Sequence, residues 1–228
     1  MIGLILPAGA VCVDAYRPDW GSLLLPEELV VVADATEPRR TEFAAGRCCA
    51  REALRRLGHS GFPILAGPDR EPLWPEGVVG SITHSADYCA AAVAAKRDLL
   101  SLGIDVEVNA ALPEGVAQLT MTECESQQID RITGVNPCAL IFSAKEALFK
   151  AWFQLARTWL DHHDAEVVLE EDRPAFSIRL SPRARDQILR SVSFYGRFAA
   201  TELRIFTAVT ATMPGSPDVS VQVGQVPC

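Results

Sequence analysis

The sequence contains no C-x-x-C pair, although it has seven cysteines. They are Cys12, Cys48, Cys49, Cys89, Cys124, Cys138 and Cys228. An odd number of cysteines without paired spacing argues against a disulfide framework and against a zinc ribbon. We therefore expect reduced cysteines and a cytoplasmic location.

Long hydrophobic runs are also missing. No uncharged stretch approaches the ~18 residues that a membrane span needs. The apolar segment Met1 to Val13 lacks a basic region and is followed at once by Asp14. We interpret this segment as a first strand rather than a signal peptide, and we expect no membrane partner.

Positive charge is scarce. The chain carries 21 Lys and Arg against 29 Asp and Glu, a net charge of −8 at pH 7, and it has no basic stripe or tail. Nucleic acid is therefore not an expected partner. An anionic ligand stays open, because a few fixed cations and a metal ion can dominate one site. The 228 residues, 49% of them hydrophobic, suffice for a sizeable core in one large domain or two small ones.

Several common catalytic motifs are absent. The sequence has no G-x-G-x-x-G, no Walker-type loop, no G-x-S-x-G and no H-E-x-x-H. Their absence argues against the commonest nucleotide-binding, hydrolase and zinc-protease families.

The spacing of apolar residues predicts a mixed α and β chain. Helical spacing covers residues 26–58, with Gly58 as the C-cap, and residues 137–157, the clearest helix in the sequence. Residues 59–77 and 108–116 indicate loops, and 213–228 indicate a loose tail. Strands are expected at 78–84, 90–95, 99–106, 165–169, 175–180, 194–200 and 204–212, although 90–95 has no clear period. Because several strands are adjacent in sequence, α+β is favoured over a doubly wound fold.

Two carboxylates lie two residues apart in the apolar stretch from Gly103 to Glu107. In a strand, Asp105 and Glu107 project to one face while Ile104 and Val106 point into the core. Neighbouring carboxylates repel each other, and a cation between them removes that cost. The alternative is a solvated strand end before the following loop.

A second charged group interrupts the helix expected at 137–157. It comprises Lys145, Glu146 and Lys150, and it begins forty residues after Asp105. Charges on a largely buried helix need partners, and this combination suits a metal ion and a phosphate. The alternative is an ordinary surface ion pair between Glu146 and Lys150, which are four residues apart.

Further candidate residues precede these two motifs. Thr83 and His84 end an expected strand, where a histidine beside small hydroxyl residues suits an anion. Taken alone, His84 is better explained as a core or capping residue. In the first helix, Arg47, Arg51 and Arg55 recur at intervals of four and share one face.

Taken together, these motifs resemble the 4′-phosphopantetheinyl transferases, in particular the EntD-type subgroup of the Sfp/EntD-like superfamily. That family pairs a G-[IV]-D-x-E strand with a [FW]-[ST/C]-x-K-E-[AS]-x-x-K helix some forty residues later, and both are present here in order. The segment from Glu42 to Leu54 and the block from Arg70 to His84 add to the match. The resemblance covers roughly residues 26–212.

The resemblance implies a reaction. The 4′-phosphopantetheine arm of coenzyme A moves to a serine of an apo acyl or peptidyl carrier protein, and adenosine 3′,5′-bisphosphate leaves. Asp105, Glu107 and Glu146 would hold Mg2+, and water would complete the position that Val106 cannot supply. Glu146, directly or through a metal-bound water, would be the general base, with Lys150 at the pyrophosphate.

The resemblance also implies a set of residues that bind coenzyme A. They are Arg47, Arg51, Arg70, Thr83, His84, Lys145 and Lys150. Arg47 and Arg70 are expected at the nucleotide end, including its 3′-phosphate, and His84 at a phosphate. The partners implied are carrier proteins of polyketide, nonribosomal-peptide or siderophore synthases.

The fold implied by the resemblance is α+β, with two similar halves related by pseudo-twofold symmetry. The halves would be residues 1–102 and 103–212, with coenzyme A in the cleft between them and 213–228 as a tail. Because one chain already supplies both sides of the cleft, a monomer is expected. Carrier proteins are usually acidic, as this chain is, so we expect docking through apolar residues of 117–121, namely Leu119 and Met121.

Two other functions stay open. A non-catalytic module could bind coenzyme A or carrier proteins, but all three carboxylates and both lysines are present. A magnesium-dependent phosphoesterase would need a dedicated hydrolytic base, and the sequence marks none beyond Glu146. The central expectation is that the fold closes the forty-residue gap and brings the strand and the helix together around one Mg2+.

Overall fold

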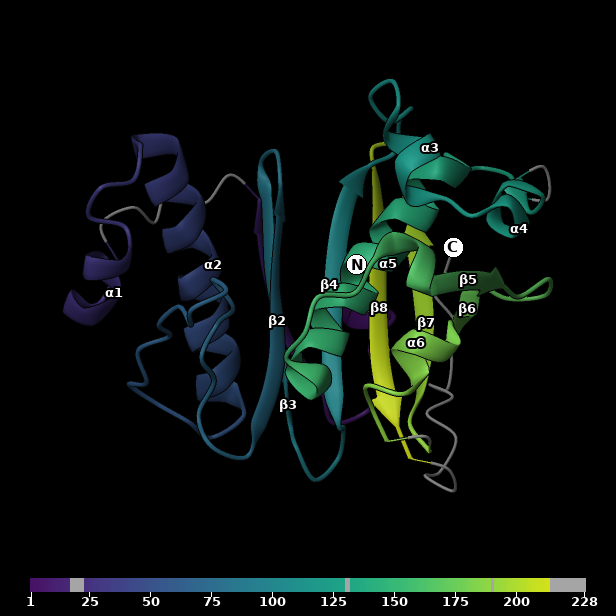
Figure 1. Ribbon diagram of the computed structural model, residues 1–228. Coiled ribbons are helices and arrows are strands. Elements are labelled where there is room, and N and C mark those ends of the chain that lie inside the picture. The colour runs from purple at the N-terminus through teal and green to yellow at the C-terminus, as the bar shows by residue number, and fades with distance from the viewer. Residues whose placement is uncertain (17–22, 130–131, 190, 214–228) are drawn as a thin grey trace.

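Two antiparallel sheets stand side by side, and each is covered by one long helix (Figure 1). This computed structural model describes residues 1–16, 23–129, 132–189 and 191–213. The expected α+β class is confirmed. Of the expected tail, all but Met213 lies outside the described residues.

The N-terminal half contains a three-stranded sheet in the order β1-β3-β2. Helix α2 lies against one face of this sheet (Figure 1), with Ala50, Ala53 and Leu54 packed on the strands. The elements are η1 (Ile2–Leu4), β1 (Val11–Tyr16), α1 (Pro26–Val31), α2 (Glu37–Arg56), β2 (Val78–Ser85) and β3 (Tyr88–Ala95).

Two expectations for this half were wrong. The apolar start forms a 3-10 turn at Ile2–Leu4, and the first strand begins only at Val11. The helix expected over 26–58 is two helices, because α1 ends at Val31 and Thr36 caps a new helix with Pro38 in its first turn. Gly58 does follow the second helix, with a positive φ of 100°.

The C-terminal half contains a five-stranded sheet in the order β4-β8-β7-β6-β5. Helix α5 covers one face and places Leu148 and Trp152 in its main core. The elements are β4 (Ser101–Val108), α3 (Val116–Thr120), α4 (Glu123–Ser126), α5 (Pro137–Ala156), η3 (His162–Asp164), β5 (Ala165–Leu169), β6 (Ala175–Leu180), α6 (Pro182–Arg185), β7 (Ser193–Ala200) and β8 (Arg204–Thr212).

The two sheets meet where β2 lies beside β4. The hydroxyl oxygen of Ser81 accepts a hydrogen bond from the Ile104 amide at 3.1 Å, and that of Thr83 accepts one from the Val106 amide at 3.2 Å. Apolar side chains of both sheets also form one buried cluster. The halves therefore share a core at their junction.

The two halves are alike in having one helix of 20 residues on an antiparallel sheet, but the sheets have three and five strands. The chain passes from one sheet to the other between Ala95 and Ser101, close to the expected boundary at 102/103. The domain boundary and the pseudo-twofold relation stay predictions.

Gly103 allows α5 to lie directly on β4. A Cβ atom at this position would stand 1.9 Å from the carbonyl oxygen of Ala147. No side chain fits there without moving the helix, so the glycine of the G-I-D-V-E stretch fixes the approach of β4 to α5. This contact closes the forty-residue gap between the two acidic motifs.

In the described part of the chain, no helix is long and apolar enough to cross a membrane. The six cysteines found there are all free.

Candidate active site

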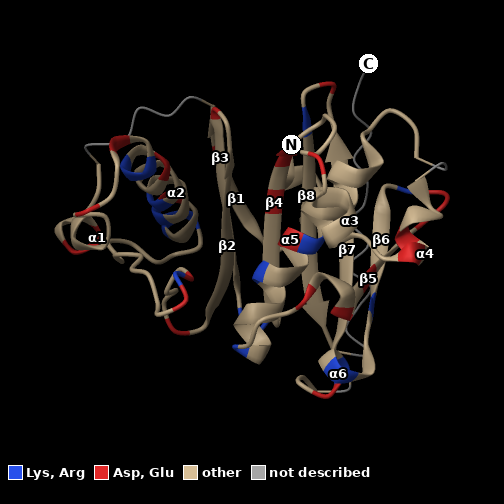
Figure 2. Ribbon diagram, turned by 45° about the horizontal axis from the view of Figure 1, so that its top comes forward, with Lys and Arg blue, Asp and Glu red and all other residues tan. Residues whose placement is uncertain are grey.

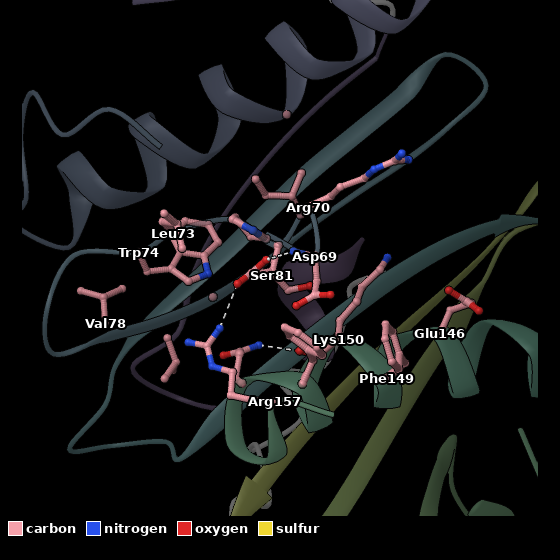
Figure 3. A pocket seen from close by; sticks show the side chains of 18 of the residues that line it. Asp69, Arg70, Leu73, Trp74, Val78, Ser81, Glu146, Phe149, Lys150 and Arg157 are labelled. Atoms are coloured by element: carbon pink, nitrogen blue, oxygen red, sulfur yellow. Dashed lines mark hydrogen bonds and ion pairs between the residues drawn. The ribbon is translucent and has the colours of Figure 1, made fainter. Parts of the chain in front are cut away.

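A pocket of about 640 Å³ opens between the two halves (Figure 3). Glu146 and Phe149 lie toward one end of it, while Leu73 and Trp74 lie toward the other. Basic side chains from both halves line the pocket: Arg39, Arg47, Arg70, His84, Lys96, Lys150 and Arg157. The pocket is therefore suited to a ligand with several anionic groups.

The N-terminal wall of the pocket is built from α2, the loop before β2, and β2 itself. Arg47 is buried, and its Nε donates to the carbonyl oxygen of Ile64 at 2.8 Å while its guanidinium lies 4.1 Å above the Phe43 ring. Burial lowers the pKa of Arg47 to about 10, against the opposing effect of Glu28, so the side chain stays charged near neutral pH. Arg47 lines the pocket beside Phe43.

His84 lies near the opening of this wall. Its Nε2 is 3.4 Å from Nη1 of Arg39, which comes from the first turns of α2. Desolvation lowers the pKa of His84, although its ring remains exposed to solvent, and Arg39 lowers it further while Glu42 opposes both. The rim therefore carries the positive charge of Arg39 beside a neutral imidazole ring.

The C-terminal wall is organised around Asp105, which is buried between β4 and α5. Nζ of Lys150 donates to Oδ1 of Asp105 at 2.7 Å and to the carbonyl oxygen of Ile104 at 3.0 Å. The hydroxyl of Ser143 donates to Oδ2 at 2.8 Å, and that of Thr83 donates to Oδ1 at 3.2 Å. Side chains of two neighbouring elements, α5 and β2, therefore hold this carboxylate of β4 in place.

Glu107 and Glu146 lie in the same electrostatic neighbourhood. Burial raises the pKa of Glu107 to about 7, and Asp105 and Glu146 raise it further against Lys150. Burial also raises the pKa of Glu146, with a further contribution from Asp105. Figure 2 shows the acidic residues of β4 beside the charged residues of α5. Negative charge is thus crowded here, and a cation would relieve it.

The Mg2+ site predicted from Asp105, Glu107 and Glu146 stays a prediction. Among the residues that the structure describes, no three His, Cys, Asp or Glu side chains are arranged to hold a metal ion. The ammonium group of Lys150 instead forms an ion pair with the carboxylate of Asp105. The oxygen donors and the raised pKa values of Glu107 and Glu146 fit a hard divalent cation, but the side chains have to rearrange to bind it.

Lys145 does not face the pocket, so its expected contact with phosphate is wrong. Successive helical residues point about 100° apart, and Lys145 turns to the opposite side of α5 from Lys150. There it forms a buried ion pair with Glu125 at 2.8 Å. A buried ammonium with an anionic partner has no need of a ligand phosphate.

Arg51 and Thr83 are also misplaced by the sequence prediction. Arg51 forms an ion pair with the fully buried Glu28 and donates to the carbonyl oxygen of Leu23, outside the pocket lining. Thr83 is buried at the junction of the sheets and contacts Asp105 rather than the cavity. Both residues support neighbours of the pocket without lining it.

The basic pocket residues Arg39, Lys96 and Arg157 were missed in the sequence. Arg39 lies four and eight residues before Phe43 and Arg47, so helical spacing could have found it on the same face of α2. Arg157 follows α5 with a positive φ of 53° and pairs with Glu71 of the opposite half at 3.2 Å. No local pattern marks that contact, because its partners are far apart in sequence.

Comparisons with known proteins now decide the family. The model for the 4′-phosphopantetheinyl transferase N-terminal domain matches residues 25–94, and that for the 4′-phosphopantetheinyl transferase superfamily matches residues 101–205. The chain belongs to the 4′-phosphopantetheinyl transferase superfamily. Transfer of a phosphopantetheine group is therefore the activity of this transferase, as the sequence motifs predicted.

Individual relatives agree with this assignment. The transferase is 41% identical to the 4′-phosphopantetheinyl transferase Svp of Streptomyces mobaraensis, over 94% of this chain and 90% of that protein. It is 38% identical to the 4′-phosphopantetheinyl transferase PptT of Mycobacterium tuberculosis, over 80% and 83% of the two chains. It is 32% identical to enterobactin synthase component D of Salmonella typhi, over 65% and 62%. The sequence identity to enterobactin synthase component D is thus lower than the identity to Svp and PptT.

Proposed function

We propose that this transferase moves the 4′-phosphopantetheine arm of coenzyme A to a serine of an apo acyl or peptidyl carrier protein. The observation that carries the proposal is one cavity joining a basic wall to Glu146 and Lys150. Its volume of about 640 Å³ is within the range of cofactor sites. The names of the relatives support the transferred group.

Coenzyme A would lie along the pocket with its nucleotide on the N-terminal wall. Arg47 and Arg70 are our candidates for the nucleotide end, including its 3′-phosphate, and Arg39 joins them from the same wall. His84 and Lys150 would contact the pyrophosphate between the two halves. Guanidinium groups suit this task because they bind phosphate oxygens with two parallel hydrogen bonds.

The chemical step would take place beside Glu146. Its carboxylate accepts the proton of the carrier serine, and the serine oxygen forms a bond to the phosphorus that bears the pantetheine arm. The bond from this phosphorus to the bridging oxygen breaks, and that oxygen leaves with adenosine 3′,5′-bisphosphate. Glu146 lines the pocket, where burial, and then Asp105, raise the pKa of its carboxyl group. Lys150 supplies positive charge where the leaving oxygen becomes anionic.

Asp105, Glu107 and Glu146 would hold Mg2+, which supplies neutralisation of the pyrophosphate when bound. For Asp105 to bind Mg2+, its ion pair with the ammonium group of Lys150 has to break. Lys150 would then be able to bind a phosphate of coenzyme A. We expect EDTA to abolish transfer and added Mg2+ to restore it.

Carrier docking is proposed on α3. Leu119 is 71% exposed on this helix and offers an apolar contact. The expected contribution of Met121 is wrong, because Met121 is buried in the core beside α5. Replacing Leu119 with Asp should raise the KM for the carrier protein while leaving the KM for coenzyme A unchanged. An unchanged carrier KM would reject this surface.

One experiment tests the proposed function. The protein is incubated with Mg2+, coenzyme A and an apo carrier protein, and the carrier is weighed by mass spectrometry. A mass increase of one phosphopantetheine arm on the carrier serine is expected. Coenzyme A that binds without any such increase would instead identify a non-catalytic binding module.

The setting of the reaction follows from the same proposal. Carrier proteins of polyketide, nonribosomal-peptide or siderophore synthases are the expected partners. The free cysteines of the described residues agree with a reducing, cytoplasmic compartment. Both walls of the pocket come from one chain, so we propose a monomer.

A further inference from the structure

Lys145 and Glu146 are consecutive on α5, but only Glu146 lines the large pocket. Glu146 lines the coenzyme A pocket, whereas Lys145 is only 3% exposed and points toward α3 and η3. Nζ of Lys145 donates to the carbonyl oxygens of Thr120 and His162, both at 2.6 Å, and to the carboxylate of Glu125. An ammonium has three donors, so every one of them is used inside the protein.

Glu125 is equally engaged. It is fully buried, and its Oε2 accepts from the amide of Thr122 while its Oε1 accepts from the amide of Val167, both at 2.7 Å. Through this one ion pair, α5 is tied to the end of α3, to the first residues of α4 and to β5. These attachments leave little freedom for the segment that begins at α3.

Stability of the fold is a poor explanation for burying this ion pair. Moving two charges out of water is unfavourable, and apolar side chains of similar volume often stabilise a fold as well or better. What a saturated buried pair does supply is one defined arrangement of the elements it joins. Here the elements are α3, which carries the exposed Leu119, and α5, which carries Glu146.

We propose that Lys145 is a positioning residue that, through Glu125 and Thr120, sets the distance between the carrier-docking face of α3 and the carboxylate of Glu146. The inference rests on the proposed function. A carrier protein that docks against Leu119 must deliver its serine to Glu146 in one approach. If α3 shifts, the docked serine is displaced from the base, although coenzyme A still binds on the other face of α5.

The test replaces the pair by apolar groups of similar size, in the double variant Lys145→Met/Glu125→Leu, which leaves no buried charge behind. Two quantities are measured: the dissociation constant for coenzyme A by calorimetry and kcat/KM for the apo carrier protein. We expect unchanged coenzyme A affinity and a fall of about 10-fold to 100-fold in kcat/KM for the carrier, as for small displacements of reacting groups. Native coenzyme A affinity also shows that the variant is folded.

A control replaces a more exposed ion pair of the C-terminal half. In Arg179→Met/Glu166→Leu, a pair between β5 and β6 receives the same substitutions, and carrier kinetics should not change. Combining the Lys145→Met/Glu125→Leu change with Leu119→Asp should add little further loss, because both act on the same docking contact.

Three results would overturn the proposal. Coenzyme A affinity that falls as much as carrier turnover would mean that Lys145 reaches the ligand. Unchanged carrier kinetics would mean that the pair is structural only. Full additivity with Leu119→Asp would mean that the pair acts elsewhere than on α3. Coenzyme A binding and carrier modification are first measured on the wild-type protein. If the wild type modifies no carrier, the proposed function itself is wrong. That result is therefore separate from a failure of the proposal on Lys145.

Discussion

The two walls of the pocket hold their charges in different ways. On the N-terminal wall, Arg39, Arg47 and Arg70 present cations from a helix and a loop, and the charges are spread along the cavity. On the C-terminal wall, Lys150 and Ser143 both bond to the buried Asp105, so that the charged groups depend on one another. The contrast suggests that one wall binds the ligand and the other carries out the chemistry.

The largest effect should follow from removing the proposed base. Glu146→Gln keeps the size of the side chain but cannot accept the serine proton, so kcat should fall about 10³-fold. Affinity for coenzyme A should stay or rise slightly, since a negative charge leaves the pocket. Single-turnover kinetics and calorimetry on the same sample measure both. Retained kcat would show that the C-terminal wall does not carry out the chemistry.

Gly103→Ala breaks the contact that assembles the C-terminal wall. The new Cβ would meet the Ala147 carbonyl oxygen at 1.9 Å, so α5 must move away from β4. We expect a loss of about 3 kcal/mol in unfolding free energy, as for an overpacked core. Urea titration measures the stability loss. A variant as stable as wild type would show that the two motifs are not fixed by this contact.

Arg39→Met tests the N-terminal wall. The change removes a cation at the rim beside His84, so the KM for coenzyme A should rise about tenfold while kcat at saturation stays the same, as for loss of one charged hydrogen bond. Arg55→Met, on the exposed side of the same helix, is the control and should change neither value. A fall in kcat at saturating coenzyme A would contradict the division between the walls.

The smallest effect concerns pH. Glu107 has a pKa raised from 4.5 to about 7, so its folded form favours the proton. Its contribution to stability is therefore complete below about pH 4.5 and is lost as the pH rises through about 7. Glu107→Gln should accordingly gain more stability over wild type at pH 8 than at pH 5, in urea titrations with EDTA. An equal difference at both pH values would remove Glu107 from the crowded carboxylate group.

The sequence predicted the C-terminal wall better than the N-terminal one, for a physical reason. Asp105, Glu107, Glu146 and Lys150 belong to two short motifs whose strand and helix periods fix which side chains share a face. The structure brings the two motifs together where α5 lies on β4, and the roles of these residues stay predictions. The prediction that Lys145 contacts a phosphate failed for a simple reason. Helical periodicity shows that two adjacent residues point in different directions, but not which of them faces the ligand.

The N-terminal wall combines residues from separate segments. Arg47 and Arg70 line it as expected, but Arg51 turns to Glu28, and Arg39 was missed. Glu28 lies 23 residues before Arg51 and is buried in an ion pair with it. Nothing local in the sequence indicates this contact. Similarly, no sequence pattern indicates that the ammonium of Lys150 forms an ion pair with Asp105. Such choices depend on tertiary packing, which spacing does not reveal.

The central claim is that the phosphopantetheine arm is transferred and not hydrolysed. The most direct measurement is the amount of adenosine 3′,5′-bisphosphate released for each carrier protein modified, with wild-type enzyme, Mg2+ and coenzyme A. The account predicts one nucleotide for each arm attached, and none when the carrier is left out. Release of the nucleotide without a carrier would contradict it, because Glu146 would then be activating water instead of the carrier serine.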